Sequence, residues 1–491
     1  MNKKLQGIII CVVVILCLGG TLLLLNLTGD NGKDNSSTSE SSSASDSKED
    51  NSILIIDSSS DKVTSVDVSN KLGKFTIQKD TTGKTLWNVK ELKGLDQSQS
   101  LIELIMDKVV QYKSDKLVEE KTENLNKYGL DNPEAEFTVN FSDKTKRTFL
   151  IGNKAPDETK YRYVTEKDSG KVYLVTKGYT NDFLEGKEQY VSISLIDSPE
   201  EVDFGELTIS RKDLNYKMKF VQDTSGDEDN GMMSAQVMVQ PIYSYLNGSS
   251  SQNVTHGLWG LKANSAVEIY PDDAAKKKYG ITDPVATVDY KGEDDHFTLS
   301  IGNPIYASNE NGEKSDTIVG YYCYLKGVDG KDCIWEIPAD SLPWTTVVPE
   351  DIITTVMTYN NISKIDTISV EGKDINKKYE LSSEDEELKS AKSNGKDVNV
   401  EDFKTFYQYF LSCPTSEIWY KNTSGDKFMT IKIQSDDNTD TLEFYKDKSS
   451  ERKVVVKRNG QTSFRIPLAW CEKFNKNIES LENGGEIFAS Y

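Results

Sequence analysis

Two histidines, His256 and His296, are the only imidazole bases that this chain can offer to catalysis. A nucleophilic hydrolase needs a Ser or Cys beside such a base, and the sequence contains no G-x-S-x-G elbow. His296 alternates out of phase with the apolar Phe297 and Leu299, which predicts a solvent-facing position on a strand. His256 lies off the apolar face of its predicted helix. We therefore expect no catalytic residue and predict that the protein is not an enzyme.

Acidic side chains are abundant, with 79 Asp and Glu against 58 Lys and Arg and a net charge of −21. Such a chain lacks the clustered cations that bind phosphates, which excludes nucleic acid as a partner. The acidic segment 227–231 resembles a calcium loop, but its glycine comes one position early, and Met238 stands where the closing Glu belongs. No C-x-x-C, Walker A or G-x-G-x-x-G pattern occurs. We expect neither a metal site nor a cofactor.

The six cysteines fall into two groups. Cys11 and Cys17 lie in an apolar N-terminal segment, where they act as small apolar residues. The other four lie in a part of the chain that we expect outside the cytoplasm, where disulfides can form. Cys323 and Cys333 flank a four-residue turn in a predicted hairpin. A turn of this length shifts strict cross-strand pairing by one residue, which makes a disulfide between these two cysteines less favourable. The candidate disulfides are Cys323 with Cys333, and Cys413 with Cys471.

A Tyr-Gly-Leu/Ile-x-x-Pro motif occurs twice, and an Ile-Gly pair follows each copy. The separation from the motif tyrosine to the second glycine is 24 positions in the first copy and 23 in the second. Two independent patterns at nearly the same separation indicate a duplicated domain rather than a short solenoid repeat. The motif residues are Tyr128, Gly129, Leu130, Pro133 and Gly152 in the first copy, and Tyr279, Gly280, Ile281, Pro284 and Gly302 in the second.

The residue types of this motif are typical of a helix end. Gly129 can take a positive φ just after a short helix, and Leu130 can supply the hydrophobic contact that accompanies such a cap. Pro133 prevents the helix from continuing. We interpret both copies as structural, each leading from a helix into a strand, and not as ligand loops.

The predicted elements keep one order in three parts of the chain. Each part opens with a strand, followed by a helix and a series of alternating strands. The third part lacks the motif, and it is divergent, but its order of elements is the same. The sequence predicts an α+β fold of three tandem domains, each an antiparallel sheet with one main helix. The predicted domains are 53–198, 199–349 and 350–491; the predicted helices are 96–112, 252–264, 400–412 and 467–481.

The N-terminus is predicted to anchor the chain in the cell membrane. Residues 7–27 are almost entirely apolar and long enough to cross a bilayer. Lys3 and Lys4 precede them, so the positive-inside rule keeps residues 1–6 cytoplasmic and places the rest outside as a single-pass protein. The Ser- and Asp-rich residues 28–52 are predicted to be a disordered tether. A cleaved signal peptide or lipid anchor is the alternative, although no A-x-A-like site follows the apolar run.

The motif, the alternating strand after it, the Ile-Gly turn and a Tyr-rich hairpin resemble the bacterial domain-of-unknown-function 4340 family. The resemblance covers much of 63–344, with Ile281 in place of the family's Leu in the second copy. It implies an extracytoplasmic protein associated with ABC-type transport systems of the gliding-motility kind. The family has no established activity, so the resemblance assigns no catalytic residue.

We expect a membrane-anchored accessory or scaffold protein of an ABC-type transport complex that acts by binding permease-type membrane proteins. One alternative is a cell-surface module that binds envelope polymer or an extracellular ligand, for which the 24 tyrosines could provide stacking. A second is a carboxylate-based hydrolase, which the many Asp and Glu residues allow but for which no site is recognisable.

Overall fold

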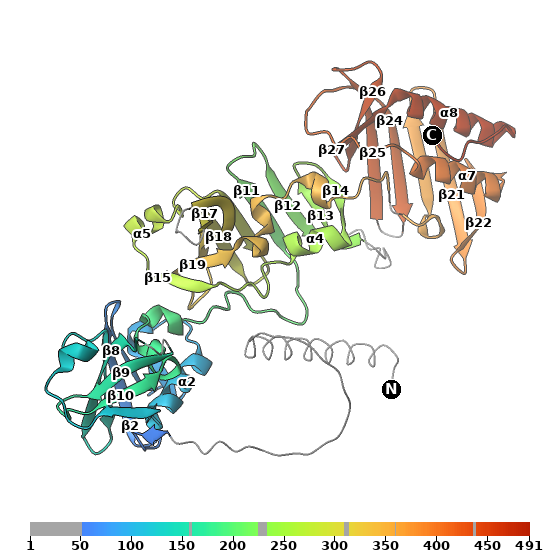
Figure 1. The fold of residues 1–491 in the computed structure, drawn as a ribbon. Coiled ribbons are helices and arrows are strands. Elements are labelled where there is room, and N and C mark those ends of the chain that lie inside the picture. The colour runs from blue at the N-terminus through green and yellow to red at the C-terminus, as the bar shows by residue number, and fades with distance from the viewer. Residues whose placement is uncertain (1–51, 157–159, 224–232, 309–313, 359, 436–437) are drawn as a thin grey trace, which may run out of the picture. The chain divides into compact units, whose positions relative to one another are not determined.

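A computed structural model describes residues 52–491, except for 157–159, 224–232, 309–313, 359 and 436–437 (Figure 1). The predicted anchor at 7–27 and nearly all of the tether lie outside the described residues. The described part is mostly β structure, arranged in four antiparallel sheets. The smallest of these pairs only β1 (Ile53–Leu54) with β5 (Lys113–Ser114).

The predicted fold class, α+β behind an N-terminal transmembrane helix, is wrong. Strands predominate over helices, and among the described helices none has both the length and the apolarity to span a membrane. One reason is that helices in the structure are shorter than the sequence predicts. The predicted helix 252–264 is α4, Gly248–Thr255, which ends just before Gly257 and the left-handed Gly260 (φ 80°). A second reason is that the third part gains strands between residues 376 and 398 that the sequence pattern did not predict.

The first large sheet has eight strands in the order β4-β3-β2-β7-β8-β9-β10-β6. In that order they span Trp87–Val89, Gly73–Lys79, Val63–Asn70, Ala135–Phe141, Lys146–Lys154, Tyr161–Glu166, Val172–Thr176 and Lys116–Glu119. The accompanying helices are α2 (Gln99–Val110) and α3 (Lys177–Thr180), with 3-10 helices η1 (Lys90–Leu92), η2 (Leu125–Tyr128), η3 (Asn181–Phe183) and η4 (Lys187–Tyr190).

The second large sheet has nine strands in the order β14-β13-β12-β11-β16-β17-β18-β19-β15. In that order they span Ser244–Asn247, Met233–Gln240, Lys217–Gln222, Glu206–Arg211, Ala286–Lys291, His296–Ser308, Lys314–Lys326, Cys333–Pro338 and Ser265–Ile269. Its helices are α4, α5 (Asp273–Lys278) and α6 (Pro349–Ile352), with η5 (Ala339–Ser341) and η6 (Pro343–Thr345).

The third large sheet has eight strands in the order β23-β22-β21-β20-β24-β25-β26-β27. In that order they span Lys396–Val398, Glu387–Ser393, Asn376–Glu384, Thr367–Gly372, Ser424–Ser435, Asn438–Asp447, Lys453–Arg458 and Gln461–Pro467. Helices α7 (Val400–Leu411) and α8 (Leu468–Asn483) pack together on this sheet, and η7 (Ile362–Lys364) precedes β20 (Figure 1).

The three large sheets share one connectivity. The run β3-β2-β7-β8-β9-β10 of the first corresponds to β12-β11-β16-β17-β18-β19 of the second and β21-β20-β24-β25-β26-β27 of the third. In the first two sheets a further strand, β6 or β15, completes the same edge. Among the described strands of the third sheet, β27 ends that edge without such an addition.

Alternating and helical apolar patterns build the cores. In β7, Ala135, Phe137 and Val139 are buried while the residues between them are not. In α7, Phe403, Phe406 and Phe410 face inward at helical spacing. The first two sheets contribute to one continuous buried cluster, whereas the third sheet has a cluster of its own.

Candidate functional site

Both copies of the Tyr-Gly motif form helix ends, as expected from their residue types. Gly129 caps η2 with φ 67°, and Gly280 follows α5 and Tyr279 with φ 78°. The backbone N–H of Asn303 donates to the carbonyl of Tyr279 (2.9 Å), and its side chain donates to the carbonyl of Lys278 (3.1 Å). The motif therefore joins a helix end to the strand that carries the Ile-Gly pair.

The second glycine of each copy permits this close approach. A Cβ on Gly152 would collide with the carbonyl of Tyr128, and one on Gly302 with the carbonyl of Tyr279. The apolar residues Leu130 and Ile281 lie directly beside these glycines. Only a residue without a side chain fits between the helix end and the strand at these two positions.

The prolines and tyrosines of the two copies also occupy matching places. The residue after Pro133 donates its N–H to Ile151 O, and the residue after Pro284 donates to Ile301 O, both at 2.8 Å. The motif tyrosines each pack against a tyrosine of the neighbouring strand, with ring centroids 4.8 Å apart in both copies. These pairs are Tyr128 with Tyr163 and Tyr279 with Tyr322. The motif is thus a packing device in both sheets.

The two histidines lie in unlike surroundings. His296 is 62% exposed on β17, and its Nε2 lies 3.2 Å from Asp289 Oδ1. Burial opposes the charge of Asp289, but hydrogen bonds from Thr298 and His296 outweigh it and lower the pKa of that carboxyl. The Thr298 hydroxyl donates to Asp289 and not to His296, so it is not activated as a nucleophile. These groups form a polar pair on an open sheet face.

His256 is half-buried rather than on the surface. Its Nδ1 lies 2.9 Å from the hydroxyl of Thr255, and its ring packs near Phe204 and Trp259. Burial lowers the pKa of His256, which favours the neutral ring. The amphipathic pattern missed this position because the aromatic neighbours come from other elements.

All four described cysteines, Cys323, Cys333, Cys413 and Cys471, are free and buried, so neither candidate disulfide is formed in this structure. In the β18–β19 hairpin Cys323 pairs with Trp335, which places the two cysteines two positions out of register. Burial raises the pKa of all four thiols, to about 12 for Cys333. Such thiols are poor nucleophiles at neutral pH.

The acidic segment 227–231 lies outside the described residues. Within the described ranges, no group of three or more His, Cys, Asp or Glu side chains could hold a metal ion.

The feature of the structure that best suits binding is a cleft of about 620 Å³ between α2, η4 and β15. Its apolar lining includes three unusually exposed side chains: Leu72 (62%), Leu101 (44%) and Ile193 (43%). Exposed apolar groups that gather at a cleft mark a binding surface more often than scattered ones do. The remaining lining residues are Ser98, Glu185, Gly186, Glu188, Gln189, Val191, Asn264, Ser265, Ala266 and Val267.

Backbone and side-chain hydrogen bonds hold the cleft walls in place. The Asn70 amide donates to the carbonyls of Phe183 (2.9 Å) and Glu185 (2.7 Å), which ties the acidic wall to the β2–β3 hairpin. Ser98 N donates to Tyr190 O at 2.8 Å, which joins the start of α2 to the end of η4. The walls are therefore fixed before a ligand arrives, which lowers the entropic cost of binding.

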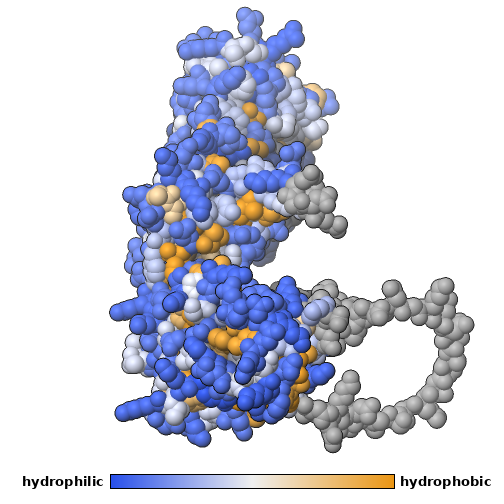
Figure 2. Space-filling model, turned by 60° about the vertical axis from the view of Figure 1, so that its left-hand side comes forward, coloured by the Kyte–Doolittle hydropathy of each residue, from blue (hydrophilic) through white to orange (hydrophobic). Residues whose placement is uncertain are grey.

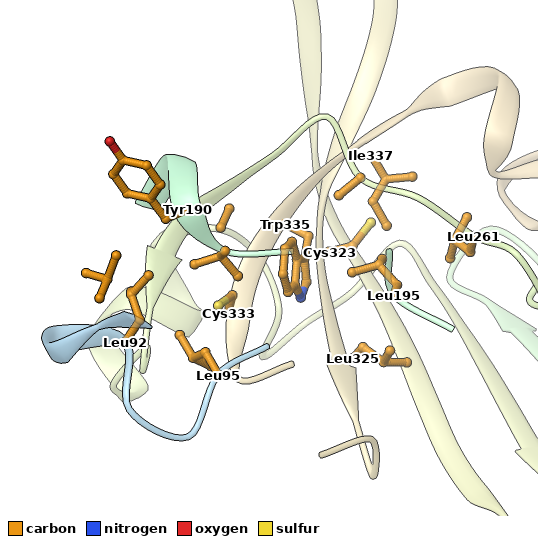
Figure 3. Close-up of a cluster of buried hydrophobic side chains, with 14 of the residues drawn as sticks. Leu92, Leu95, Tyr190, Leu195, Leu261, Cys323, Leu325, Cys333, Trp335 and Ile337 are labelled. Atoms are coloured by element: carbon orange, nitrogen blue, oxygen red, sulfur yellow. The ribbon is translucent and has the colours of Figure 1, made fainter. Parts of the chain in front are cut away.

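The buried ammonium group of Lys331 joins the segment before α2 to the segment after η4. Lys331 is 6% exposed; its Nζ lies 2.7 Å from Asp96 Oδ2 and donates to Ser194 O at 2.6 Å. Figure 3 shows the adjoining apolar cluster, where Trp335 of the second sheet lies among side chains from the η1 region and from the 190–195 segment. The Lys331 contacts and this apolar core hold together segments that lead into the cleft walls at Ser98 and Ile193.

The electrostatic character of the cleft is acidic. Glu185 is exposed on the rim, and Glu188 pairs with Lys187, which does not line the cleft, at 2.9 Å. None of the described lining residues is basic. The surface visible in Figure 2 is mostly hydrophilic, with separate hydrophobic areas. The cleft thus combines apolar lining residues with negative charge.

No residue of this cleft was predicted from the sequence to form a binding site. Its walls come from positions as far apart as Leu72 and Val267, so no local motif marks it. Leu101 follows the apolar spacing of the predicted helix 96–112 and was expected on its inward face, but it is 44% exposed in the structure. The one available signal was that this helix has more apolar residues than one buried face can hold, since Leu101 and Leu104 both lie outside its buried stripe.

Comparison with known proteins identifies a family without assigning an activity. Residues 87–284 match the family described as a domain of unknown function (DUF4340). No curated protein and no solved structure matches the chain significantly. The match runs from β4 of the first sheet to the second copy of the Tyr-Gly motif, and it supports a protein of the DUF4340 family over these residues.

Proposed function

We propose that the protein is a non-enzymatic accessory or scaffold protein that acts by binding another protein through the acidic cleft. The main support for this proposal is that three exposed apolar side chains, Leu72, Leu101 and Ile193, lie together in one preformed cleft. Exposed apolar surface of this kind is typical of protein interaction sites.

The geometry of the titratable groups agrees with binding more than with catalysis. The Asp289 and His296 pair has a hydroxyl neighbour that donates away from the base. The thiols are buried with raised pKa values, which leaves their reactive thiolate form scarce. The cleft itself contributes two carboxylates, one of them paired with a lysine.

The proposed partner is a permease subunit of an ABC-type transport complex, met on the outer side of the membrane. The resemblance of the Tyr-Gly segments to their family supports this class of partner by analogy. A rigid cleft on a chain of repeated sheets suits a scaffold, because it can hold one partner while other surfaces remain available.

Site-specific crosslinking in living cells tests this proposal. A photoreactive phenylalanine analogue at Leu101 lies in the cleft, whereas the same analogue at Leu104 lies on α2 outside it, with a similar exposed fraction of 50%. We expect position 101 to crosslink to ABC permease subunits, identified by mass spectrometry, and position 104 not to.

Two outcomes would contradict the proposal. Equal crosslinking at both positions would show that the cleft is not the binding site. Attachment of position 101 to envelope polymer alone would favour the cell-surface binding module instead.

A further inference from the structure

We propose that the cleft binds an extended segment of its partner, which adds to the edge of β15 as a further strand and carries basic side chains beside apolar ones. This inference rests on the proposed protein-binding function and specifies the chemistry of the bound segment.

The outer edge of β15 pairs with no described strand, because β15 is the last strand of its sheet, although η4 lies close to it. The segment Ile193–Leu195 runs antiparallel along Leu261–Ala263, with Leu195 N donating to Leu261 O and Ala263 N donating to Ile193 O, both at 2.9 Å. This pairing occupies the backbone edge of Leu261–Ala263, just before β15 begins at Ser265.

Beyond Ala263 the covering segment turns away. Ser192 N donates to Asp96 O at 2.8 Å, and Val191 bridges to Gln97 instead of continuing along β15. The segment before Ile193 and the segment after Ala263 therefore separate from each other, and residues of both line the cleft. Ser265–Val267 line it, and β15 is the last strand of its sheet among the described strands.

A strand edge that lines a cleft and pairs with no described strand favours a peptide over a small molecule. Edge strands offer rows of backbone donors and acceptors that an added strand can pair with, and alternate side chains of that strand then enter neighbouring pockets. The existing contact of Ile193–Leu195 with Leu261–Ala263 already shows this geometry one step along the same edge.

The lining decides which side chains the added strand carries. Leu72, Leu101 and Ile193 offer apolar contact, which suits β-branched side chains. Glu185 supplies an exposed negative charge, whereas Glu188 is already paired with Lys187, and no lining residue among those described is basic. The free carboxylate of Glu185 suits Lys or Arg. Because successive side chains of a strand point to opposite sides, a segment of alternating basic and β-branched residues can present both kinds of side chain to the lining.

Binding of short synthetic peptides to the purified chain tests the inference. The probe is a fluorescein-labelled octapeptide of alternating Lys and Val, and the comparison peptide alternates Glu and Val. In anisotropy titrations at moderate salt, we expect the Lys-Val peptide to bind about tenfold more tightly or better. N-methylation of every second amide on one edge should weaken binding by about tenfold, because strand addition needs those N–H groups.

Matched variants separate the cleft from the general negative charge of the chain. Leu101→Asp should weaken binding by about tenfold, whereas Leu104→Asp on the same helix should change it by less than about twofold. Glu185→Lys should weaken binding severalfold, and Glu103→Lys, on an exposed position of α2 outside the cleft, should not.

The inference is overturned if the two peptides bind equally, if N-methylation has no effect, or if Leu104→Asp acts like Leu101→Asp. If position 101 crosslinks to permease subunits but the Lys-Val peptide fails to bind, the proposed function stands and the strand-addition chemistry is wrong. If crosslinking at 101 also fails, the proposed function is wrong as well.

Discussion

At the scale of single residues, the two glycines of each Tyr-Gly copy have different tasks. Gly129 supplies a left-handed backbone beside the Asn153 side chain, whereas Gly152 makes room for a backbone carbonyl. A side chain can move aside more easily than a carbonyl fixed at a helix end. The spacing between the two glycines is therefore as important to the fold as their identity.

Substitution by alanine should separate these tasks. Gly129→Ala should lower the free energy of unfolding by about 1 kcal/mol or more, because φ is positive there. Gly152→Ala should lower it by about 2 kcal/mol or more, because the Cβ meets Tyr128 O. Gly178→Ala, with only Thr176 Oγ1 nearby at 3.9 Å, is the control and should stay within about 0.5 kcal/mol. Urea unfolding measures all three, and equal losses at the three sites would contradict this interpretation.

A second residue-scale prediction concerns pH. The Asp447 side chain is fully buried; it accepts hydrogen bonds from Ser449 N and Oγ and pairs with Arg465 at 3.0 Å. Burial opposes its charge, but these partners outweigh it and lower the pKa of Asp447 to about 2. Because the native pKa lies below the unfolded value, the stability that Asp447 contributes is complete above about pH 4 and is lost as the pH falls toward 2.

Asp447→Asn should therefore be less stable than the parent at neutral pH by about 2 kcal/mol, from the pKa difference. The gap should close between about pH 4 and pH 2. Thermal unfolding measured across this range checks it, with the exposed Asp374→Asn as the control variant. A gap that does not change with pH would show that Asp447 contributes through shape and not through charge.

At the scale of elements, strand register determines what the cysteines can do. The β18–β19 hairpin pairs Cys323 with Trp335 and Tyr324 with Ile334. Cys333 is therefore two positions away from the residue that lies opposite Cys323. Both thiols point into a core that excludes reagents.

This register predicts the behaviour of the thiols. The thermal midpoint of residues 52–491 should be the same with and without a reducing agent, because none of the four described cysteines is oxidised. All four should resist alkylation until the chain is unfolded by denaturant, as measured by mass spectrometry. A midpoint that falls on reduction would instead indicate a disulfide at one of the two candidate pairs.

At the scale of the whole molecule, the cores divide the chain differently from the repeats. The first two sheets contribute to one buried cluster that includes Trp335, while the third sheet builds another around Trp470. Trp470 lies among aromatic rings from α7, α8 and β25, all within its own cluster. From these two separate clusters we expect the three similar sheets to make two cooperative units.

Calorimetry should show this division. We expect two unfolding transitions, with Trp335→Ala destabilising one of them by about 3–5 kcal/mol and leaving the other unchanged. Trp470→Ala should act in the same way on the other transition. If both substitutions shift a single shared transition, the two cores are coupled more strongly than their separate packing implies.

The sequence by itself determined the local features of this protein. It indicated the buried alternation of β7, the inward face of α7 and the two glycine caps, because each depends on neighbours within a few positions. It also carried the family resemblance, since the Tyr-Gly motif is continuous along the chain.

Only the tertiary structure decided the predominance of strands, the state of the cysteines and the cleft. The strands β21, β22 and β23 are rich in charged residues and form through successive pairing outward from β20, not through an apolar pattern of their own. The cysteine register depends on how a hairpin closes. The cleft joins Leu72, Leu101, Ile193 and Val267, and residues so far apart meet only because long-range packing brings their elements together.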